Sequence, residues 1–363
     1  MALKCGIVGL ANSGKTTLFN CMSNTRAEAS TAAFSGTRSN LGVVHVPDSR
    51  LYRLAELQPT KKIVHTTIEF VDIPGLAKGG GAGQGNRFLS DVRNTDALLH
   101  VVRCFDDDAL PHVEGSVDPV RDIETVNLEL QVKDLESVGR KLEKVEKLVR
   151  IGDKEAGKAA GALTVYREHL ESFRPARTVP LDAGDRLHAG DLFLLSDKPV
   201  IYICNVDESS AADGNRYSRQ VEKALEGERA EVLAVAAAVE ADIAELDSEE
   251  DRSAFLQDMG LAEPGVNRVI RAAYRLLDLR TFFTVGPKEV RAWTIRAGMT
   301  AQQAAGVIHS DLERGFIRAE VIAYDDFVSL GSEAACRDKG KLSVEGRNYE
   351  VKDGDLLNIR FNV

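Results

Sequence analysis

A nine-residue stretch near the start of the chain limits its possible folds more than any other feature. Residues 9–17, Gly-Leu-Ala-Asn-Ser-Gly-Lys-Thr-Thr, match the pattern G-x-x-x-x-G-K-[ST] of a phosphate-binding loop. A short apolar run from Leu3 to Val8 precedes it and predicts a buried strand, and residues 17–22 after it have the composition of a helix. Strand, glycine loop and helix in this order are the context that the motif requires. The sequence therefore predicts a nucleotide-binding site here.

The residue types of this stretch suit phosphate binding. Gly9 and Gly14 let the backbone curve closely around an anion, so that successive amide N–H groups point inward, and the following helix N-terminus adds partial positive charge. Lys15 supplies a cation for the outer phosphates and a candidate catalytic group, and the hydroxyl of Thr16 can bind Mg²⁺. The nucleotide contacts predicted from this stretch are Asn12, Ser13, Gly14, Lys15, Thr16 and Thr17.

A second motif follows a predicted strand at residues 66–71. It reads Asp72-Ile73-Pro74-Gly75, a D-x-x-G sequence. An aspartate at the end of a strand can hold Mg²⁺, usually through water, while the amide of Gly75 faces a γ-phosphate. The motif is a weak signal alone and a strong one at this distance after a phosphate loop. Thr16 and Asp72 are therefore the predicted metal ligands.

The residue after this motif predicts an unusual catalytic arrangement. Many GTPases have a glutamine there that orients the attacking water, whereas this chain has Leu76, which cannot do so. His112 lies in a loop after another predicted strand, at residues 97–105, and is the candidate replacement. From the residues alone, a surface histidine without a catalytic role is the alternative.

Two further segments have the composition of switch loops. Residues 25–41 are polar and rich in Ala, Ser and Thr, which fits either a nucleotide-sensing switch or an ordinary surface loop. Residues 78–85 are too rich in glycine for a regular helix or strand and predict a second switch.

The tetrad Asn205-Val206-Asp207-Glu208 bears on the choice of base. A GTPase carries N-K-x-D at the end of the corresponding strand, and its aspartate accepts both N–H groups of guanine. Glu208 replaces that aspartate and Val206 replaces the lysine, so the guanine contact should be lost. The tetrad favours ATP, with a GTPase of relaxed motif as the alternative.

The remaining pattern predicts the domain organisation. Strands and helices alternate as in a doubly wound parallel α/β sheet. Apolar residues at spacings of three and four predict a helical hairpin, and a different pattern of short strands predicts a C-terminal α+β domain. The predicted domains are a nucleotide-binding domain at 1–126 and 191–278, a helical coiled-coil insertion at 127–190, and the C-terminal domain at 279–363.

The hairpin carries a cluster of basic residues. It comprises Arg140, Lys141, Lys144, Lys147 and Arg150. A binding face and a solvated helix surface are equally compatible with this pattern.

Composition limits the partners and the compartment. The formal charge of −10 argues against generic, charge-driven binding to nucleic acid, DNA included, or to an anionic membrane, so any nucleic-acid partner would need a local basic patch. No signal sequence or apolar run of transmembrane length is apparent, and the five cysteines lack metal-ligand spacing. A cytoplasmic protein with buried free thiols is expected.

These residues together resemble the YchF/Obg-like ATPases, an Obg-related family of P-loop NTPases. The matching runs cover nearly the whole chain: residues 9–17, 40–50, 72–105, 112–135, 205–208, 240–246 and most of 281–363. The resemblance implies a G domain interrupted by a coiled-coil insertion and followed by a TGS domain with a β-grasp fold. It also implies slow hydrolysis of ATP in preference to GTP, and association with the ribosome in translation and stress responses.

The resemblance also implies roles for individual residues. His112 corresponds to the histidine proposed as catalytic, and Asn12 to the asparagine that related NTPases use to hold K⁺. Two positions depart from the family pattern. The threonine of the first switch falls on Gly36, with Thr37 displaced by one. Ala236 replaces a serine that contacts the base, which leaves only backbone contacts there.

The leading hypothesis is thus a weak cytoplasmic ATPase that acts as a ribosome-associated switch. It would bind ATP or ADP with Mg²⁺, and the base would lie against Asn205 and Val206. A GTPase of translation-factor type is the second hypothesis. The third is a binding adaptor whose nucleotide site is mainly structural.

Overall fold

A computed structural model describes residues 3–23, 39–76, 82–228 and 230–362. The chain forms two compact units. The first comprises Met1–Gly42 with Glu69–Val269, and the second comprises Val43–Ile68 with Ile270–Val363. The predicted switch at 25–41, including Gly36 and Thr37, lies almost wholly outside the described residues.

The first unit is built on a six-stranded sheet with the order β2-β4-β1-β5-β6-β7. The strands are β1 (Lys4–Val8), β2 (Asn40–His45), β4 (Thr67–Asp72), β5 (Ala97–Cys104), β6 (Val200–Val206) and β7 (Glu231–Val235). From β4 to β7 every neighbouring pair is parallel. The predicted α/β class is therefore confirmed. Because the strands are parallel, their carboxyl ends lie at one edge, and this is where the ligand loops meet.

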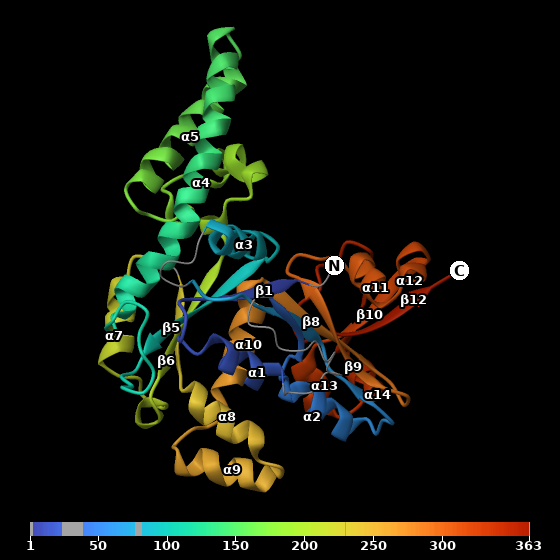
Figure 1. Cartoon of the computed structure of the whole chain (residues 1–363). Coiled ribbons are helices and arrows are strands. Elements are labelled where there is room, and N and C mark those ends of the chain that lie inside the picture. Colours follow the sequence, from blue (N-terminus) through green and yellow to red (C-terminus); the bar gives the residue numbers. More distant parts are fainter. Residues whose placement is uncertain (1–2, 24–38, 77–81, 229, 363) are drawn as a thin grey trace. The chain divides into compact units, whose positions relative to one another are not determined.

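Helices cover both faces of this sheet (Figure 1). They are α1 (Lys15–Ser23), α3 (Ala82–Arg93), α4 (Pro119–Arg150), α7 (Arg216–Ala224), α8 (Ala237–Glu245), α9 (Glu249–Asp258) and α10 (Gly265–Leu276), the last of which crosses into the second unit. One core cluster combines Phe88 of α3, Ile123 of α4 and Val221 of α7 with the strand residues Leu98 and Tyr202. Three helices thus anchor on the same apolar face.

Helix α3 corrects one prediction from the sequence. The glycine-rich stretch 78–85 was expected to contain no helix, yet α3 begins at Ala82. Phe88 and Val92 of this helix are almost fully buried in the core. Burial of these side chains outweighs the low helix propensity of the preceding glycines.

The predicted helical hairpin is formed by α4 and α5 (Lys154–Glu171), which extend away from the sheet (Figure 1). Helix α4 begins at Pro119, ahead of the predicted start near 127, because the Asp118 side chain caps it and proline suits its first position. The hairpin has a core of its own, with Val138 and Leu142 facing Leu163 and Tyr166. Four short helices return the chain to β6: η1 (Ala176–Thr178), α6 (Ala183–Arg186), η2 (Leu187–Leu192) and η3 (Leu195–Asp197).

The second unit contains a mixed six-stranded sheet with the order β11-β10-β12-β8-β9-β3. Its strands are β3 (Ile63–Val64), β8 (Leu279–Val285), β9 (Val290–Arg296), β10 (Phe316–Ile322), β11 (Leu342–Glu345) and β12 (Leu356–Phe361). Its helices are α2 (Ser49–Leu57), α11 (Ala301–Ile308), α12 (Ser310–Arg314), α13 (Tyr324–Leu330) and α14 (Glu333–Asp338). A C-terminal α+β domain was predicted, and this unit provides it.

The second unit also takes in a segment that the sequence analysis assigned to the nucleotide-binding domain. Helix α2 places Leu51 and Leu54 in one core cluster with Phe283 and Val290. Both leucines are fully buried. Within 43–68, the apolar side chains of α2 and β3 pack with the C-terminal strands, whereas the two ends of this segment pair in the first sheet as parts of β2 and β4.

Two sequence expectations about composition can also be compared with the structure. All five cysteines are free and buried, as expected. Among the described residues, no helix is both long enough and apolar enough to cross a membrane.

Candidate nucleotide-binding site

The phosphate loop connects β1 to α1 and has a backbone shape that depends on its glycines. Gly9 has a φ of 147° and Gly14 a φ of 94°. A Cβ on Gly9 would lie 2.3 Å from the carbonyl oxygen of Val101, and one on Gly14 would lie 2.2 Å from Nδ2 of Asn205. Neither position can therefore accept a side chain without displacing its neighbour.

Lys15 lies inside this loop and links it to the D-x-x-G motif. Its side chain is buried, and Nζ donates a hydrogen bond of 2.5 Å to the carbonyl oxygen of Leu10. Gly75 approaches so closely that a Cβ there would lie 2.6 Å from Nζ. Burial lowers the pKa of Lys15 to about 8, although the negative charge of Asp72 opposes this shift. The loop thus holds a desolvated amine beside the glycine of the second motif.

The two predicted metal ligands are in contact. Oγ1 of Thr16 donates a hydrogen bond of 2.9 Å to Oδ2 of Asp72. Burial raises the pKa of Asp72, while the Thr16 hydrogen bond and Lys15 counteract the shift. The second carboxylate oxygen, Oδ1, is buried and has no hydrogen-bond partner within the described ranges.

This oxygen pair fits Mg²⁺. Magnesium prefers oxygen ligands and commonly uses one or two protein side chains together with phosphate and water. Within the described part of the chain, no group of three or more His, Cys, Asp or Glu side chains could hold a metal. Thr16 and Asp72 would therefore hold the ion together with the nucleotide.

Asn205, near the carboxyl end of β6, joins the phosphate loop to helix α8. Its Nδ2 donates a hydrogen bond of 3.0 Å to the carbonyl oxygen of Ser13, and its Oδ1 accepts one of 3.0 Å from the amide of Ala237. Ala236 is buried and occupies the N-cap of α8 without a side-chain cap. The tetrad thus begins with a residue whose whole amide group joins the loop to α8.

The other tetrad residues differ in exposure. Val206 ends β6 and is buried, whereas Glu208 is exposed at the start of the short helix η4 (Glu208–Ser210). Both lie at the carboxyl end of a strand beside β5 and β7. Within the tetrad, the contact with the phosphate loop is made by Asn205 through Ser13, and the other residues follow it at the same end of β6.

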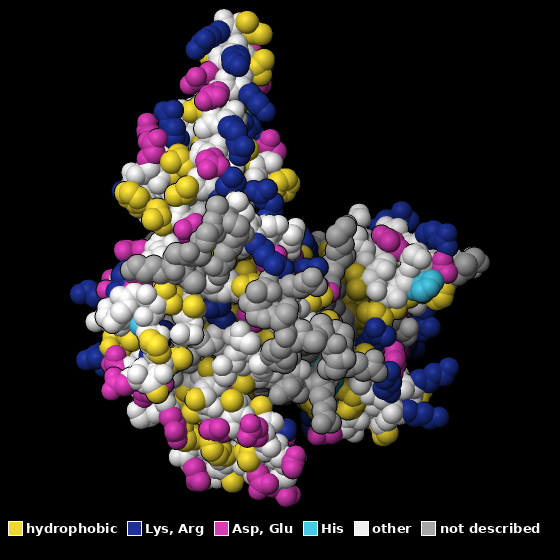
Figure 2. Space-filling model, in the orientation of Figure 1, with side chains coloured by type: hydrophobic (Ala, Val, Ile, Leu, Met, Phe, Trp, Pro, Cys, Tyr) yellow, Lys and Arg dark blue, Asp and Glu magenta, His cyan; other side chains and the backbone are white. Residues whose placement is uncertain are grey.

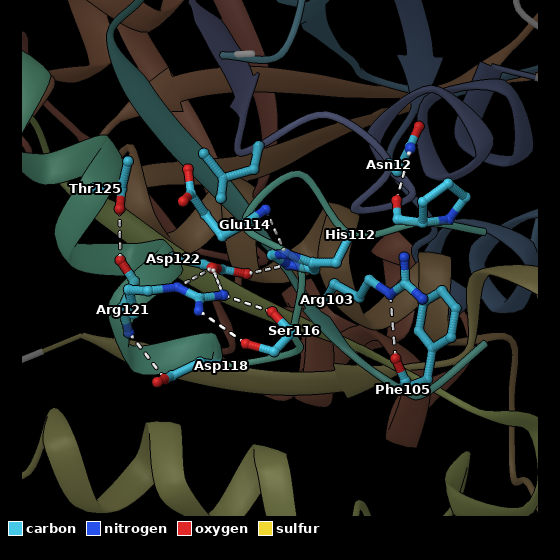
Figure 3. A network of polar contacts seen from close by, with 12 residues as sticks. Asn12, Arg103, Phe105, His112, Glu114, Ser116, Asp118, Arg121, Asp122 and Thr125 are labelled. Atoms are coloured by element: carbon cyan, nitrogen blue, oxygen red, sulfur yellow. Dashed lines mark hydrogen bonds and ion pairs between the residues drawn. The ribbon is translucent and has the colours of Figure 1, made fainter. Parts of the chain in front are cut away.

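His112 lies close to the phosphate loop but uses both of its ring nitrogens (Figure 3). Nε2 lies 2.8 Å from Oδ2 of Asp122, near the start of α4, and Nδ1 accepts a hydrogen bond of 3.0 Å from the amide of Glu114. Since Nδ1 is the acceptor, Nε2 carries the proton and donates it to the carboxylate. The His112 side chain is only 5% exposed and that of Asp122 only 4%. In this conformation His112 has no ring nitrogen left to orient water.

The loop of His112 is tied both to the sheet and to the phosphate loop (Figure 3). The Arg103 guanidinium, in β5, is buried and donates to the carbonyl oxygens of Phe105, Asp107 and Leu110. Nδ2 of Asn12 donates a hydrogen bond of 3.2 Å to the carbonyl oxygen of Pro111. Asn12 itself has a left-handed backbone, with a φ of 62°.

Sequence reasoning missed Arg103 and Asp122. The run Ala-Leu-Leu-His-Val-Val-Arg-Cys-Phe at 97–105 contains the signal for Arg103, because an arginine inside a buried strand needs acceptors nearby. Nothing in the sequence pattern pointed to the pairing of Asp122 with His112.

Known proteins resemble this chain along its whole length. Residues 4–147 match a family described as 50S ribosome-binding GTPase, and residues 279–362 match a YchF GTPase C-terminal family described as a protein of unknown function. The ribosome-binding ATPase YchF of Haemophilus ducreyi is 50% identical over 366 residues, and that of Bacillus subtilis is 47% identical over 367 residues, with all of each chain covered. The solved structure of the Schizosaccharomyces pombe YchF GTPase matches with a TM-score of 0.87 at 33% identity and covers 99% of this chain and 98% of that one.

Proposed function

Because the chain belongs to the YchF family of P-loop NTPases, we propose that it is a slow ATPase that acts in the cytoplasm as a ribosome-associated switch. It would hydrolyse ATP to ADP and phosphate and serve translation and the stress response. Two relatives named ribosome-binding ATPases, similar over their whole length, support the activity and the partner.

One observation carries the proposal more than any other. Oδ1 of Asp72, for which the described residues offer no hydrogen-bond partner, lies in a buried site beside Thr16 and Lys15. A buried carboxylate oxygen without a partner is costly unless a ligand completes its interactions. Magnesium bound to a nucleotide would supply that interaction.

The residues of the chain would divide the work. Lys15 would leave the carbonyl of Leu10 and contact the outer phosphates, while the loop amides surround them. Mg²⁺, held by Thr16 and Asp72, would neutralise phosphate charge. The Asn205 side-chain amide holds the phosphate loop in its conformation. Asn12 would bind K⁺ beside the nucleotide.

Other residues would contact the adenine base and orient the attacking water. Asn205 and Val206 would lie against adenine, Ala236 would contact it through its backbone, and Glu208 would exclude the guanine contact of an aspartate. His112 would orient the attacking water after it separates from Asp122, because both of its nitrogens are engaged in the present conformation.

The test measures the affinities of ATP and GTP and the rate of phosphate release for wild-type protein and for His112→Ala. ATP should bind more tightly than GTP, and the variant should lose hydrolysis while it retains ATP binding. GTP affinity equal to that of ATP would refute the base assignment. Unchanged turnover would remove His112 from the mechanism.

A binding adaptor is the second candidate, and the engaged state of His112 favours it. An adaptor would bind the ribosome equally well with ADP and with a non-hydrolysable ATP analogue. Co-sedimentation with ribosomes in the two states separates the candidates, because a switch requires different affinities.

A further inference from the structure

The helical hairpin carries a basic groove that the ATPase site does not use. The groove has a volume of about 610 Å³. Four cationic side chains line it, Arg93 from the end of α3 and Arg140, Lys141 and Lys144 from α4, with the single carboxylate of Asp191. Figure 2 shows basic side chains interspersed with acidic ones along this hairpin, and acidic ones gathered over α9. On a chain with a formal charge of −10, such a local excess of cations suits a polyanion.

Most of these cations are available to a ligand. Lys141 neutralises Asp191 through an ion pair and also donates to the carbonyl oxygen of His188. Arg93, Arg140 and Lys144 form no ion pair within the part of the chain that the structure describes, and all three are exposed. Arg140 and Lys144 are four residues apart on α4, so they lie on one face at a separation of about 6 Å along the axis.

An exposed aromatic ring borders the same groove. Phe193 is 75% exposed and has a left-handed backbone, with a φ of 47°, directly after η2. Its neighbours hold it in place, because Leu194 and Leu195 are buried and the amide of Leu195 donates to Asp134 of α4. A non-glycine residue rarely adopts this backbone, and such strain gathers at functional positions.

We propose that this groove binds single-stranded RNA. Arg93, Arg140 and Lys144 contact successive phosphates, and an unpaired base stacks on Phe193. Cations that follow the backbone beside an aromatic platform are the general arrangement for single-stranded nucleic acids. An acidic protein segment would pair with the cations but would leave the exposed ring of Phe193 without a role. A nucleic-acid duplex is disfavoured because its bases are stacked on one another and cannot stack on that ring. The inference rests on the proposed function, since a ribosome partner is the source of the RNA.

The experiment measures binding of a fluorescein-labelled 12-nucleotide oligouridine by anisotropy over a series of salt concentrations. The variants are R140A/K144A and Phe193→Ala, and the charge-matched control is K154A/K158A on α5. We expect R140A/K144A to weaken binding at least tenfold and to reduce the slope of log K against log salt by about 1.4, the loss of two phosphate contacts. Phe193→Ala should weaken binding about tenfold and leave the slope unchanged.

Three outcomes would overturn the inference. They are equal losses in the control, tighter binding of polyglutamate than of oligouridine, and wild-type RNA affinity in both groove variants. Phosphate release and ribosome co-sedimentation of the same variants separate this inference from the proposed function. Wild-type protein that binds ribosomes but not oligouridine overturns the groove assignment alone. Wild-type protein that binds oligouridine but not ribosomes refutes the proposed partner alone.

Discussion

Replacement of Asp122 by alanine should raise the rate of ATP hydrolysis. The Nε2–Oδ2 hydrogen bond of 2.8 Å between His112 and Asp122 is buried on both sides. Hydrogen bonds to charged groups contribute about 1.5–3 kcal/mol. If His112 must leave Asp122 to orient water, loss of this bond increases the fraction of released histidine by about 10- to 100-fold. Turnover should rise accordingly, up to the limit that the chemical step sets.

The loop should keep its position in this variant. Arg121 loses its contact with Asp122 but still donates to the carbonyl oxygen of Ser116 at 2.6 Å. Loss of a carboxylate from the first turn of α4 costs about 0.3–1 kcal/mol of helix stability. Glu124→Ala is the matched control, because Glu124 is exposed on the same helix.

The assay is single-turnover phosphate release, with thermal unfolding measured on the same samples. The double variant D122A/H112A should be as slow as His112→Ala alone, because the gain acts through His112. A slower D122A enzyme with an unchanged Tm would refute the reasoning. It would mean that Asp122 orients His112 for catalysis instead of holding it back.

Three further predictions concern the nucleotide site. Phosphate binding selects the protonated amine of Lys15, whose pKa burial lowers to about 8. ATP affinity should therefore fall as the pH rises through 8, and at pH 9 it should be about tenfold lower than at pH 7. Titration calorimetry that finds equal affinities at pH 7 and pH 9 would contradict this prediction. Asn205→Ala leaves the carbonyl oxygen of Ser13 and the amide of Ala237 without their side-chain partner, so the free energy of unfolding should fall by about 2–5 kcal/mol. An unchanged Tm would show that these two hydrogen bonds do not contribute to stability. The double change V206K/E208D should raise the affinity for GTP relative to ATP at least tenfold. If the ratio of GTP to ATP affinity is the same in the variant and the wild type, the tetrad does not determine the choice of base.

The phosphate loop and its partners could be predicted because their geometry is local. A glycine at a position of positive φ, a lysine after it and an aspartate at the end of a neighbouring strand are constraints on short segments. The hydrogen bond between Thr16 and Asp72 follows once the two strands are adjacent and parallel. Asn205 was expected at the base, and its role as a clamp on Ser13 and Ala237 appeared only in the structure.

Predictions that depended on propensity alone were less successful. Helix α3 begins inside a glycine-rich stretch because Phe88 and Val92 pack on the sheet. Residues 43–68 join the second unit because Leu51 and Leu54 complete its core. In both segments, burial of a few apolar side chains outweighs local preference.

The sequence by itself determined that this chain has a phosphate-binding loop and a nearby carboxylate, and that the usual glutamine is replaced by Leu76. These are properties of residue type and local backbone shape, which neighbouring residues along the chain dictate. The tertiary structure alone decided what His112 does in this conformation. Its nitrogens are occupied because Arg103 shapes its loop and α4 brings Asp122 within hydrogen-bond distance. Such pairings depend on how separate elements pack, and a motif does not encode them.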